Sequence, residues 1–244
     1  CQSPPGTPST TETATATTVA TAEQTPLPGT ANLYFAMADP KTGSIGIYVL
    51  APKTDRRPRL LISNADQPAI RSDGNIAYRN FSPDQLGISL AQGDGTFAAR
   101  ITTHPEDSWP TWEPGNGRVA LTSTRESDRK WRIYIAEGWH LGKDASAIAY
   151  GKSPAWGPDG TIAYRGCDPS SSHCGIYLIH ADGILVGQAT DNPDDDMPAW
   201  SPNGKYLAFT SPRSGSWSIW LKDLASSKLT RLTDDSGLDV APVW

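Results

Sequence analysis

The chain has 244 residues, with 26 acidic and 21 basic side chains, a formal net charge of −5 and a sequence pI near 5.3. This acidic balance argues against nucleic acid, or an anionic lipid surface, as the main partner of the protein. No apolar run is long enough to cross a bilayer as a helix.

The first thirty residues, from Cys1 to Thr30, contain no aromatic side chain and consist mainly of Thr, Ala, Pro and Ser. Such a segment buries too little apolar surface to offset the entropy of ordering it, so we expect an extended tether. A chain that begins on Cys and continues into such a tether resembles a bacterial lipoprotein after removal of its signal peptide. The sequence therefore predicts a lipid on Cys1 as the membrane anchor, the alternative being an arbitrary boundary that falls on Cys.

Residues 31–244 form a second predicted domain, in which a short string recurs at a nearly constant interval. Each copy has a Pro with Ile or Trp two residues later, then a two-residue turn that ends in Gly, then an apolar run. The prolines are Pro68, Pro110, Pro154, Pro198 and, in an incomplete last copy, Pro242, so the step is 42 residues and then 44. A period in this range is typical of solenoids and propeller blades.

Each repeat predicts a β-hairpin followed by two further strands. The turns Asp73-Gly74, Asn116-Gly117, Asp159-Gly160 and Asn203-Gly204 accept the positive φ angles of tight hairpins. The following runs alternate bulky apolar residues with Ala, which predicts sheets covered on both faces. These runs are 75–79, 118–123, 161–165 and 206–211; further strands are expected at 47–50, 59–62, 87–90, 97–101, 132–136, 145–150, 175–179, 184–189, 218–221 and 228–232.

Four short strands per repeat, with no helical periodicity, predict an all-β, five-bladed propeller of four-stranded antiparallel blades. The first unit begins near Leu33 and lacks the Pro-containing strand, whereas the chain ends on such a strand, Pro242-Val243-Trp244. We therefore expect this C-terminal strand to complete blade 1, with Trp244 beside Phe35, and to close the ring. The alternative is that the chain is a fragment of a larger array.

Cys167 and Cys174 flank a predicted hairpin loop, where partner strands bring side chains within bonding range. A disulfide that closes so short a loop stabilises the fold by roughly 2.5 kcal/mol in the chain-entropy model and indicates an oxidising, extracytoplasmic compartment. The metal-site alternative is weaker, because His173 adds one ligand at most and the other histidines are scattered.

The run from Met197 to Thr233 carries P-A-W-S-P-N-G-K-x-L-A-F-T-S, then S-I-W-L-K-D-L and K-L-T-R-L-T. This motif resembles the repeat of TolB-type β-propellers, which are relatives of the WD-type repeats. The resemblance covers residues 31–244 and implies the propeller fold, but it does not indicate an activity, because one fold can serve many functions. The family includes periplasmic scaffolds that bind proteins at one end of the central channel, and propeller halves of serine peptidases. The 244 residues contain neither the α/β domain of TolB nor a hydrolase domain, so we expect neither a Tol-Pal role nor peptidase activity.

Acidic residues recur just before the Pro of the inner strands. They are Asp66, Asp107, Asp196 and Asp239, with Asp194 and Asp195 added in the fifth blade, while Lys152-Ser153 interrupts the series in the fourth. Ring geometry gathers these loops at one channel mouth, which predicts a broken negative collar that binds a partner protein. The alternative for Asp66, Asp107 and Asp239 is that each accepts backbone N–H bonds within its own loop.

Asp194 and Asp195 would attract a basic segment of a partner or a cation. A structural Ca²⁺ in the channel is a weak alternative, because DNPDDDMP lacks the Gly and the distal Glu of a calcium loop; otherwise no cofactor or metal is expected. Trp109 lies outside the repeated Trp positions and is a candidate contact residue, the alternative being packing on its own loop. The repeated Trp112, Trp156, Trp200 and Trp244 are predicted wedges between blades.

The sequence has no G-x-S-x-G elbow, no H-E-x-x-H and no phosphate-cradling Gly loop. We therefore expect a non-enzymatic, lipid-anchored, periplasmic or cell-surface propeller that binds other envelope proteins as a scaffold, and no nucleic acid. One alternative is a fixed accessory subunit of a membrane-bound respiratory or photosynthetic electron-transport complex. Another is a glycan-active or glycan-binding five-bladed propeller that uses carboxylates around the channel.

Overall fold

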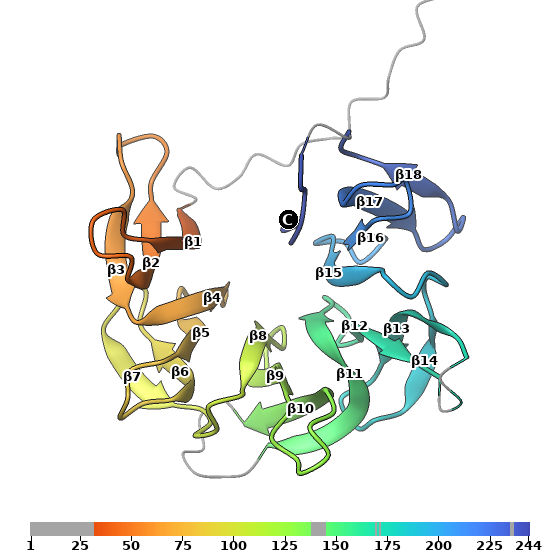
Figure 1. Ribbon diagram of the computed structural model, residues 1–244, viewed down its shortest axis with the longest axis horizontal. Helices are drawn as coiled ribbons and strands as arrows, with labels where there is room; N and C mark the ends of the chain where they lie inside the picture. Colours follow the sequence, from red (N-terminus) through yellow and green to blue (C-terminus); the bar gives the residue numbers. More distant parts are fainter. Residues whose placement is uncertain (1–31, 138–144, 169, 171, 235–236) are drawn as a thin grey trace, which may run out of the picture. The chain divides into compact units, whose positions relative to one another are not determined.

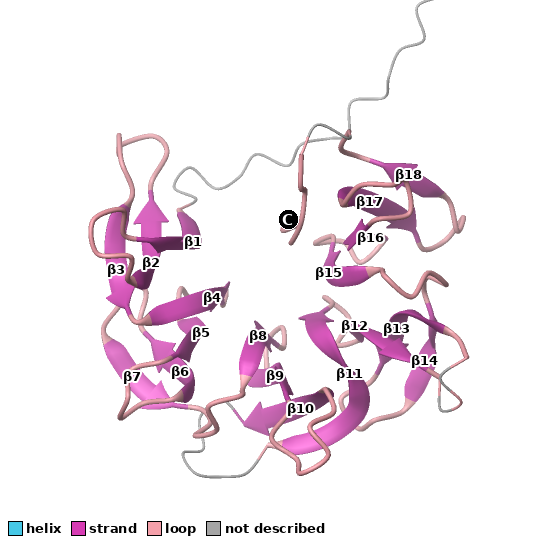
Figure 2. Ribbon diagram, viewed as in Figure 1, coloured by secondary structure: helices cyan, strands magenta, loops and turns pink. Residues whose placement is uncertain are grey.

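The computed structural model describes residues 32–137, 145–168, 170, 172–234 and 237–244. The chain divides into two units, residues 1–31 and residues 32–244. The predicted tether and Cys1 lie outside the described residues. The described part of the second unit is built from strands, turns and loops without a helix (Figures 1 and 2), so it holds no helix of the length and apolarity needed to cross a membrane.

The strands fall into five consecutive groups that follow the sequence repeat. Group 1 contains β1 (Leu33–Ala38), β2 (Ile45–Leu50) and β3 (Arg59–Ser63), and group 2 contains β4 (Ala65–Ile70), β5 (Ile76–Asn80), β6 (Gly87–Ala91) and β7 (Phe97–Arg100). Group 3 contains β8 (Ser108–Trp112), β9 (Arg118–Ser123), β10 (Arg132–Glu137) and the first part of β11 (Ser146–Trp156). The rest of β11, with β12 (Ile162–Cys167), β13 (Cys174–Ile179) and β14 (Leu185–Gln188), makes group 4; group 5 contains β15 (Asp196–Trp200), β16 (Tyr206–Ser211), β17 (Ser218–Asp223) and β18 (Leu229–Arg231).

All strand pairs within the groups are antiparallel, but groups 3 and 4 share β11 and so form one seven-stranded sheet. Residues up to Tyr150 pair with β10, and residues from Gly151 onward pair with β12. Gly151 has a φ of +156°, and a Cβ on it would lie 2.3 Å from the carbonyl oxygen of Arg165. Glycine is therefore required where the chain passes from one ladder to the next. The expected strand at 145–150 is thus the first half of β11.

The core lies between neighbouring groups. The alternating runs after the turns are almost fully buried, as in Val119-Ala120-Leu121 and Leu207-Ala208-Phe209. Four clusters of buried side chains each join two consecutive groups, from group 1 to group 5. The prediction that both faces of these strands are covered is confirmed.

Three of the repeated indoles make the same hydrogen bond to the group before them. The Nε1 atoms of Trp112, Trp200 and Trp244 donate to the carbonyl oxygens of Ala69, Ala155 and Ala199 at 3.0–3.1 Å. Trp156 instead donates to Gly160 in its own turn, at 3.1 Å. Three of the four predicted wedges therefore make the same contact between groups.

Two expectations about the ring are wrong in this structure. The first sheet has three strands, in the order β1-β2-β3, and residues 241–244 are not in a strand. The C-terminal segment lies beside group 5 (Figure 1) and does not pair with β1. The Ala241 N–H donates to Thr210 Oγ1, as that of Ser153 does to Thr122, and Trp244 donates to Ala199, as Trp112 and Trp200 do to Ala69 and Ala155. Pairing with β1 would be a separate contact across the ring, and Trp244 remains 58% exposed.

Candidate functional site

The residue before each inner-strand Pro adopts an unusual backbone conformation. Gln67, Trp109, Ser153, Met197 and Ala241 all have φ between 51° and 55°. Non-glycine residues rarely occupy this left-handed region, and here it recurs five times at one sequence position. In the four complete repeats the ladder register shifts at the same point, as between Asp66 and Ala69. A bulge therefore separates the acidic residues from the rest of each inner strand.

Side chains satisfy the backbone N–H groups that this bulge leaves outside the ladder. The N–H of Trp109 donates to Gln67 Oε1 at 2.6 Å, and that of Ser153 to Thr122 Oγ1 at 3.1 Å. In both cases the acceptor belongs to the preceding group. These polar contacts fix neighbouring groups against each other at the acidic end of the inner strands.

Asp107 and Asp195 occupy equivalent positions, and both are fully buried. Nη2 of Arg125 donates to both carboxylate oxygens of Asp107 at 2.7 Å, and Nη2 of Arg213 donates to Oδ2 of Asp195 at 2.5 Å. The guanidinium of Arg125 also stacks over Tyr134, 4.3 Å from the ring centroid. Each carboxylate therefore has an arginine partner within its own group, although Oδ1 of Asp195 has no hydrogen-bond partner among the described residues.

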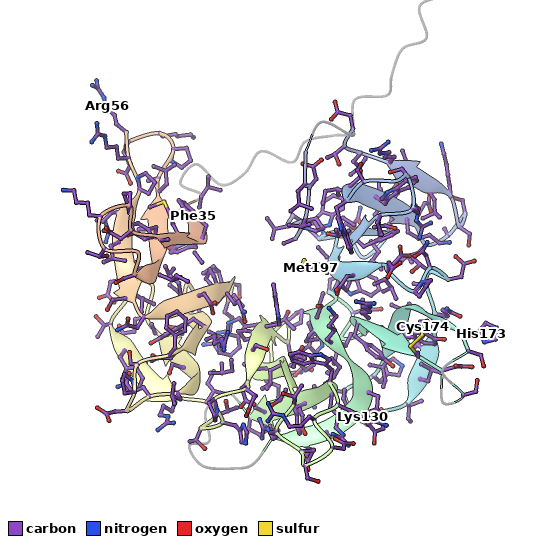
Figure 3. The ribbon with its side chains drawn as sticks, in the orientation of Figure 1. Phe35, Arg56, Lys130, His173, Cys174 and Met197 are labelled. Carbon is purple, nitrogen blue, oxygen red and sulfur yellow. A yellow bond between two sulfur atoms is a disulfide. The ribbon has the colours of Figure 1, made fainter. Side chains whose placement is uncertain are left out.

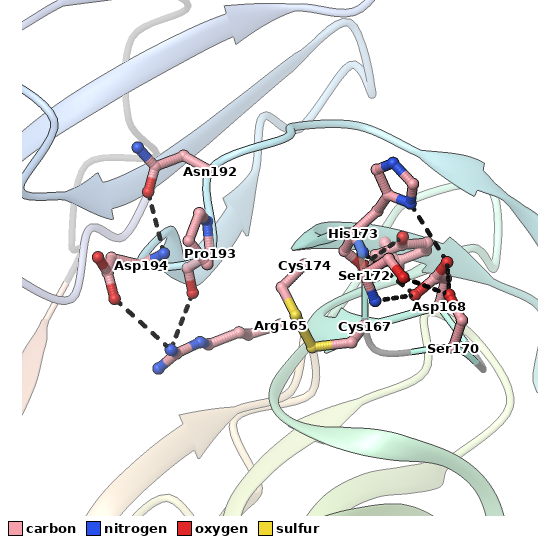
Figure 4. The surroundings of a disulfide bond; sticks show 11 residues. Arg165, Cys167, Asp168, Ser170, Ser172, His173, Cys174, Asn192, Pro193 and Asp194 are labelled. Atoms are coloured by element: carbon pink, nitrogen blue, oxygen red, sulfur yellow. Dashed lines mark hydrogen bonds and ion pairs between the residues drawn. A yellow bond between two sulfur atoms is a disulfide. The ribbon is translucent and has the colours of Figure 1, made fainter.

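Asp194 and Asp196 belong to a cluster that spans groups 4 and 5. Lys152 Nζ lies 2.7 Å from Asp196 Oδ2, and Arg165 lies 3.4 Å from Asp196 and 3.9 Å from Asp194. Burial works to raise the pKa of Asp196, but its contacts with Lys152 and Ser153 outweigh burial and hold the pKa below the ordinary value. Arg165 also donates to the Pro193 carbonyl (Figure 4). Lys152, which was predicted to interrupt the collar, balances the charge of Asp196.

Asp66 is half-buried, and burial raises its pKa, while the charge of Arg79 works in the opposite direction. The two residues are register partners on β4 and β5. Asp239 is half-buried, and its N–H donates to the Trp217 carbonyl at 3.1 Å. Trp109 is also half-buried.

The structure thus brings Asp194 and Asp196 into one cluster and distributes the other carboxylates among different groups. The basic partners were missed from sequence, although Arg125 and Arg213 follow the repeated T-S strings and Arg79 and Arg165 end the repeated A-Y-R strings. Four carboxylates of the predicted broken collar, those of Asp107, Asp194, Asp195 and Asp196, therefore have Lys or Arg partners within 4 Å. The accessible carboxylate among these is that of Asp194, whose side chain is 60% exposed.

The predicted disulfide between Cys167 and Cys174 is present, joining the facing ends of β12 and β13 with a Cα–Cα distance of 4.0 Å. The adjoining loop is organised by Asp168, which accepts hydrogen bonds from Ser170 Oγ and from the N–H groups of Ser172 and His173 (Figure 4). The Ser170 hydroxyl is the main cause that lowers the pKa of Asp168. Within the described ranges, no three His, Cys, Asp or Glu side chains gather as metal ligands. The absence of cofactors and the alternative of a bound Ca²⁺ stay predictions from the sequence.

No protein-family model matches the chain, whereas comparison with curated proteins finds TolB proteins of the Tol-Pal system. The Tol-Pal system protein TolB of Ruthia magnifica subsp. Calyptogena magnifica is 30% identical over 185 residues, 70% of this chain and 37% of that protein. The corresponding protein of Anaeromyxobacter dehalogenans is 24% identical over 166 residues, 64% of this chain and again 37% of its own length. The chain therefore spans well under half of these relatives.

Solved structures show the same fold. TolB from Acinetobacter baumannii superimposes with a TM-score of 0.70 at 16% identity, covering 86% of this chain and 54% of that one. A putative TolB from Agrobacterium tumefaciens has a TM-score of 0.60 at 20% identity, covering 77% and 69%. An oligogalacturonate lyase from Vibrio parahaemolyticus, with a TM-score of 0.51 at 18% identity, covers 76% and 56%. At these identities the likeness concerns the fold alone.

Proposed function

Because the chain is a TolB-like β-propeller protein, we propose that it binds other proteins of the cell envelope and catalyses no reaction. The relatives from the Tol-Pal system support this class of function. The observation that carries the proposal is the cluster of Lys152, Arg165, Asp194 and Asp196, which joins two groups at one end of the inner strands. Its charges are held in fixed positions, and the exposed Asp194 carboxylate is available to a basic segment of a partner.

We further propose that the protein acts outside the cytoplasm and is anchored by a lipid on Cys1. The disulfide supports an oxidising compartment, because such bonds persist outside the reducing cytosol. The Thr- and Pro-rich composition of residues 1–30 supports a tether between an anchor and the propeller. Mass spectrometry of the protein purified from membranes would test the anchor; an unmodified Cys1 thiol would contradict it.

Neither alternative has a specific observation in its favour. The lyase shares the fold at 18% sequence identity. Its likeness therefore does not assign glycan chemistry to the carboxylates, of which Asp107 and Asp195 are engaged by arginines. A subunit of an electron-transport complex would co-purify with the other subunits in a fixed stoichiometry, which affinity purification can test.

The test is affinity purification of the full chain from solubilised envelope membranes, with the variant Asp194→Asn combined with Trp109→Ala. Loss of an aromatic anchor from a protein interface costs about 2 kcal/mol or more, so recovery of a specific partner should fall at least tenfold. The control is Asp182→Asn, because Asp182 is exposed in the β13–β14 loop and lies outside the cluster. Equal recovery with both variants would contradict the proposed site, and hydrolysis or elimination of a polysaccharide by the purified chain would contradict the proposed class.

A further inference from the structure

The loop between β2 and β3 gathers basic side chains at one place on the surface. Lys53, Arg56, Arg57 and Arg59, which we call the basic loop cluster, are all exposed. With Asp55 as the single acidic residue among them, residues 53–59 have a formal charge of +3 in a chain whose net charge is −5. Figure 3 shows Arg56 at the tip of this loop, pointing away from the strands.

The carboxylate inside the loop is used to hold the loop's own shape. Asp55 Oδ2 accepts from the Ala51 N–H at 2.9 Å, and Oδ1 accepts from the Thr54 hydroxyl at 3.1 Å. The N–H groups of Thr54 and Asp55 both donate to the Ala51 carbonyl. Across the described part of the chain, Arg56, Arg57 and Arg59 form no ion pair. The turn therefore has a defined shape, and these arginines remain available to an external anion.

The repeat does not explain the cluster. The equivalent loops between the last two strands of groups 2, 4 and 5 are shorter and carry at most one Lys or Arg; they are residues 92–96, 180–184 and 224–228. The fold can therefore be built without arginines at this position. Something other than the packing of the blade accounts for the charge of the first loop.

We propose that the basic loop cluster is a docking surface for the headgroups of anionic phospholipids. A guanidinium matches a phosphate with two parallel hydrogen bonds, and each basic residue close to an anionic membrane adds to the attraction. Charges farther away than the Debye length, about 8 Å at physiological ionic strength, are largely screened. The positive charge of the loop therefore determines whether it binds an anionic membrane, although the net charge of the whole chain is negative.

The shape of the surface favours a membrane over a nucleic acid. A flat bilayer can be touched by the tip of one loop, whereas an extended polyanion needs a line of cationic contacts. The rest of this acidic chain would repel such a polymer. A membrane touched by the tip of this loop therefore fits both the basic loop and the acidic rest of the chain, whereas an extended polyanion does not.

The position of the loop is compatible with binding a protein at the acidic end. Arg59 begins β3 beside the loop, whereas Asp66 follows its other end, Ser63, after a short connection. The two features thus lie at opposite ends of β3, which spans about 16 Å at roughly 3.3 Å per residue. Lipid docking would leave the cluster around Asp194 accessible. The inference requires neither the proposed partner binding nor a lipid on Cys1.

The experiment measures sedimentation of the full, unlipidated chain with vesicles. We expect binding to vesicles of phosphatidylcholine and phosphatidylglycerol in equal parts, weakening as salt is raised, and none to phosphatidylcholine alone. The triple variant Arg56→Gln, Arg57→Gln, Arg59→Gln should lower the partition coefficient on the order of 100-fold, since each basic residue contributes roughly fivefold. The triple Lys replacement at these positions should retain most of the binding.

The matched control removes three exposed lysines elsewhere, Lys41→Gln, Lys205→Gln and Lys228→Gln, for the same change in net charge. It should bind like the unaltered chain; equal losses in both triple variants would assign the effect to overall charge and overturn the proposal. The proposal would also be overturned if the chain did not bind vesicles, or bound them equally whatever their lipid charge. It would likewise be overturned if the chain bound DNA but not vesicles. Unchanged melting temperatures verify that the variants are folded.

Discussion

At the scale of single residues, the acidic end of the inner strands is held together by pairs that join a buried carboxylate to a cation. Asp107 is fully buried against Arg125, whose side chain is 14% exposed. Asp195 and Arg213 repeat this arrangement with the same sequence separation, 18 residues. These two carboxylates are consequently structural, and the functional proposal concerns Asp194 and its neighbours.

Replacement of Asp107 by Asn should destabilise the protein by about 3 kcal/mol, because it leaves the Arg125 charge largely buried without its partner. The free energy of unfolding in urea measures this loss. The control Asp84→Asn, at an exposed loop position, should change it by less than about 0.5 kcal/mol. Adding Arg125→Gln to Asp107→Asn should restore part of the loss; a fully additive double variant would show that the two residues are not coupled.

Asp66 and Asp196 should give opposite pH dependences of stability. Burial raises the pKa of Asp66 above 3.8, so its ionisation opposes folding as pH rises through the folded-state pKa. The pKa of Asp196 is lowered, so its carboxylate stabilises the fold above 3.8 and loses this effect as pH falls toward the folded-state pKa. The free energy of unfolding of Asp66→Asn, relative to that of the unaltered chain, should therefore rise on going from acid to neutral pH. The same difference for Asp196→Asn should fall. Parallel unfolding curves across this range check both signs; the same trend for both variants would contradict the assignment.

At the scale of elements, β11 shows how two repeats are joined without a loop. Its eleven residues pair first with β10 and then with β12. The change of partner occurs at Gly151, where the backbone passes close to β12. The sequence shows the weak strand at 145–150 but not its fusion with the next inner strand.

Gly151→Ala should lower the free energy of unfolding by about 2 kcal/mol, because the new Cβ meets the Arg165 carbonyl and the positive φ is strained. Gly187→Ala is the matched control, since no atom lies within 4 Å of its added Cβ. The control should change stability by less than about 0.5 kcal/mol. Equal stability of both variants would show that the chain passes between the ladders in another way.

At the scale of the whole unit of residues 32–244, the fold is stabilised by packing between consecutive strand groups. Each core cluster joins two consecutive groups. β1 is an edge strand that pairs only with β2, and Ala241 and Trp244 donate hydrogen bonds to residues of group 5. Local contacts therefore account for the fold without pairing of the chain ends.

Hydrogen exchange of the backbone amides tests this arrangement. Alternate amides of β1 face no partner strand and should exchange much faster than those of β5, which lies between β4 and β6. Deleting residues 241–244 should leave exchange in β1 unchanged. Strong protection of β1 that disappears on this deletion would instead demonstrate the closure expected from sequence.

The sequence by itself determined the features that repeat: the step between prolines, the Gly turns, the buried alternation with Ala, and the Cys167–Cys174 hairpin bond. These depend on neighbours close in sequence, and their periodicity can be read directly. Only the tertiary structure decided that Arg125 and Arg213 neutralise buried carboxylates, that Lys152 balances Asp196, and that the first sheet has three strands. Those outcomes depend on distances between segments from different strands and groups, which no periodic pattern specifies.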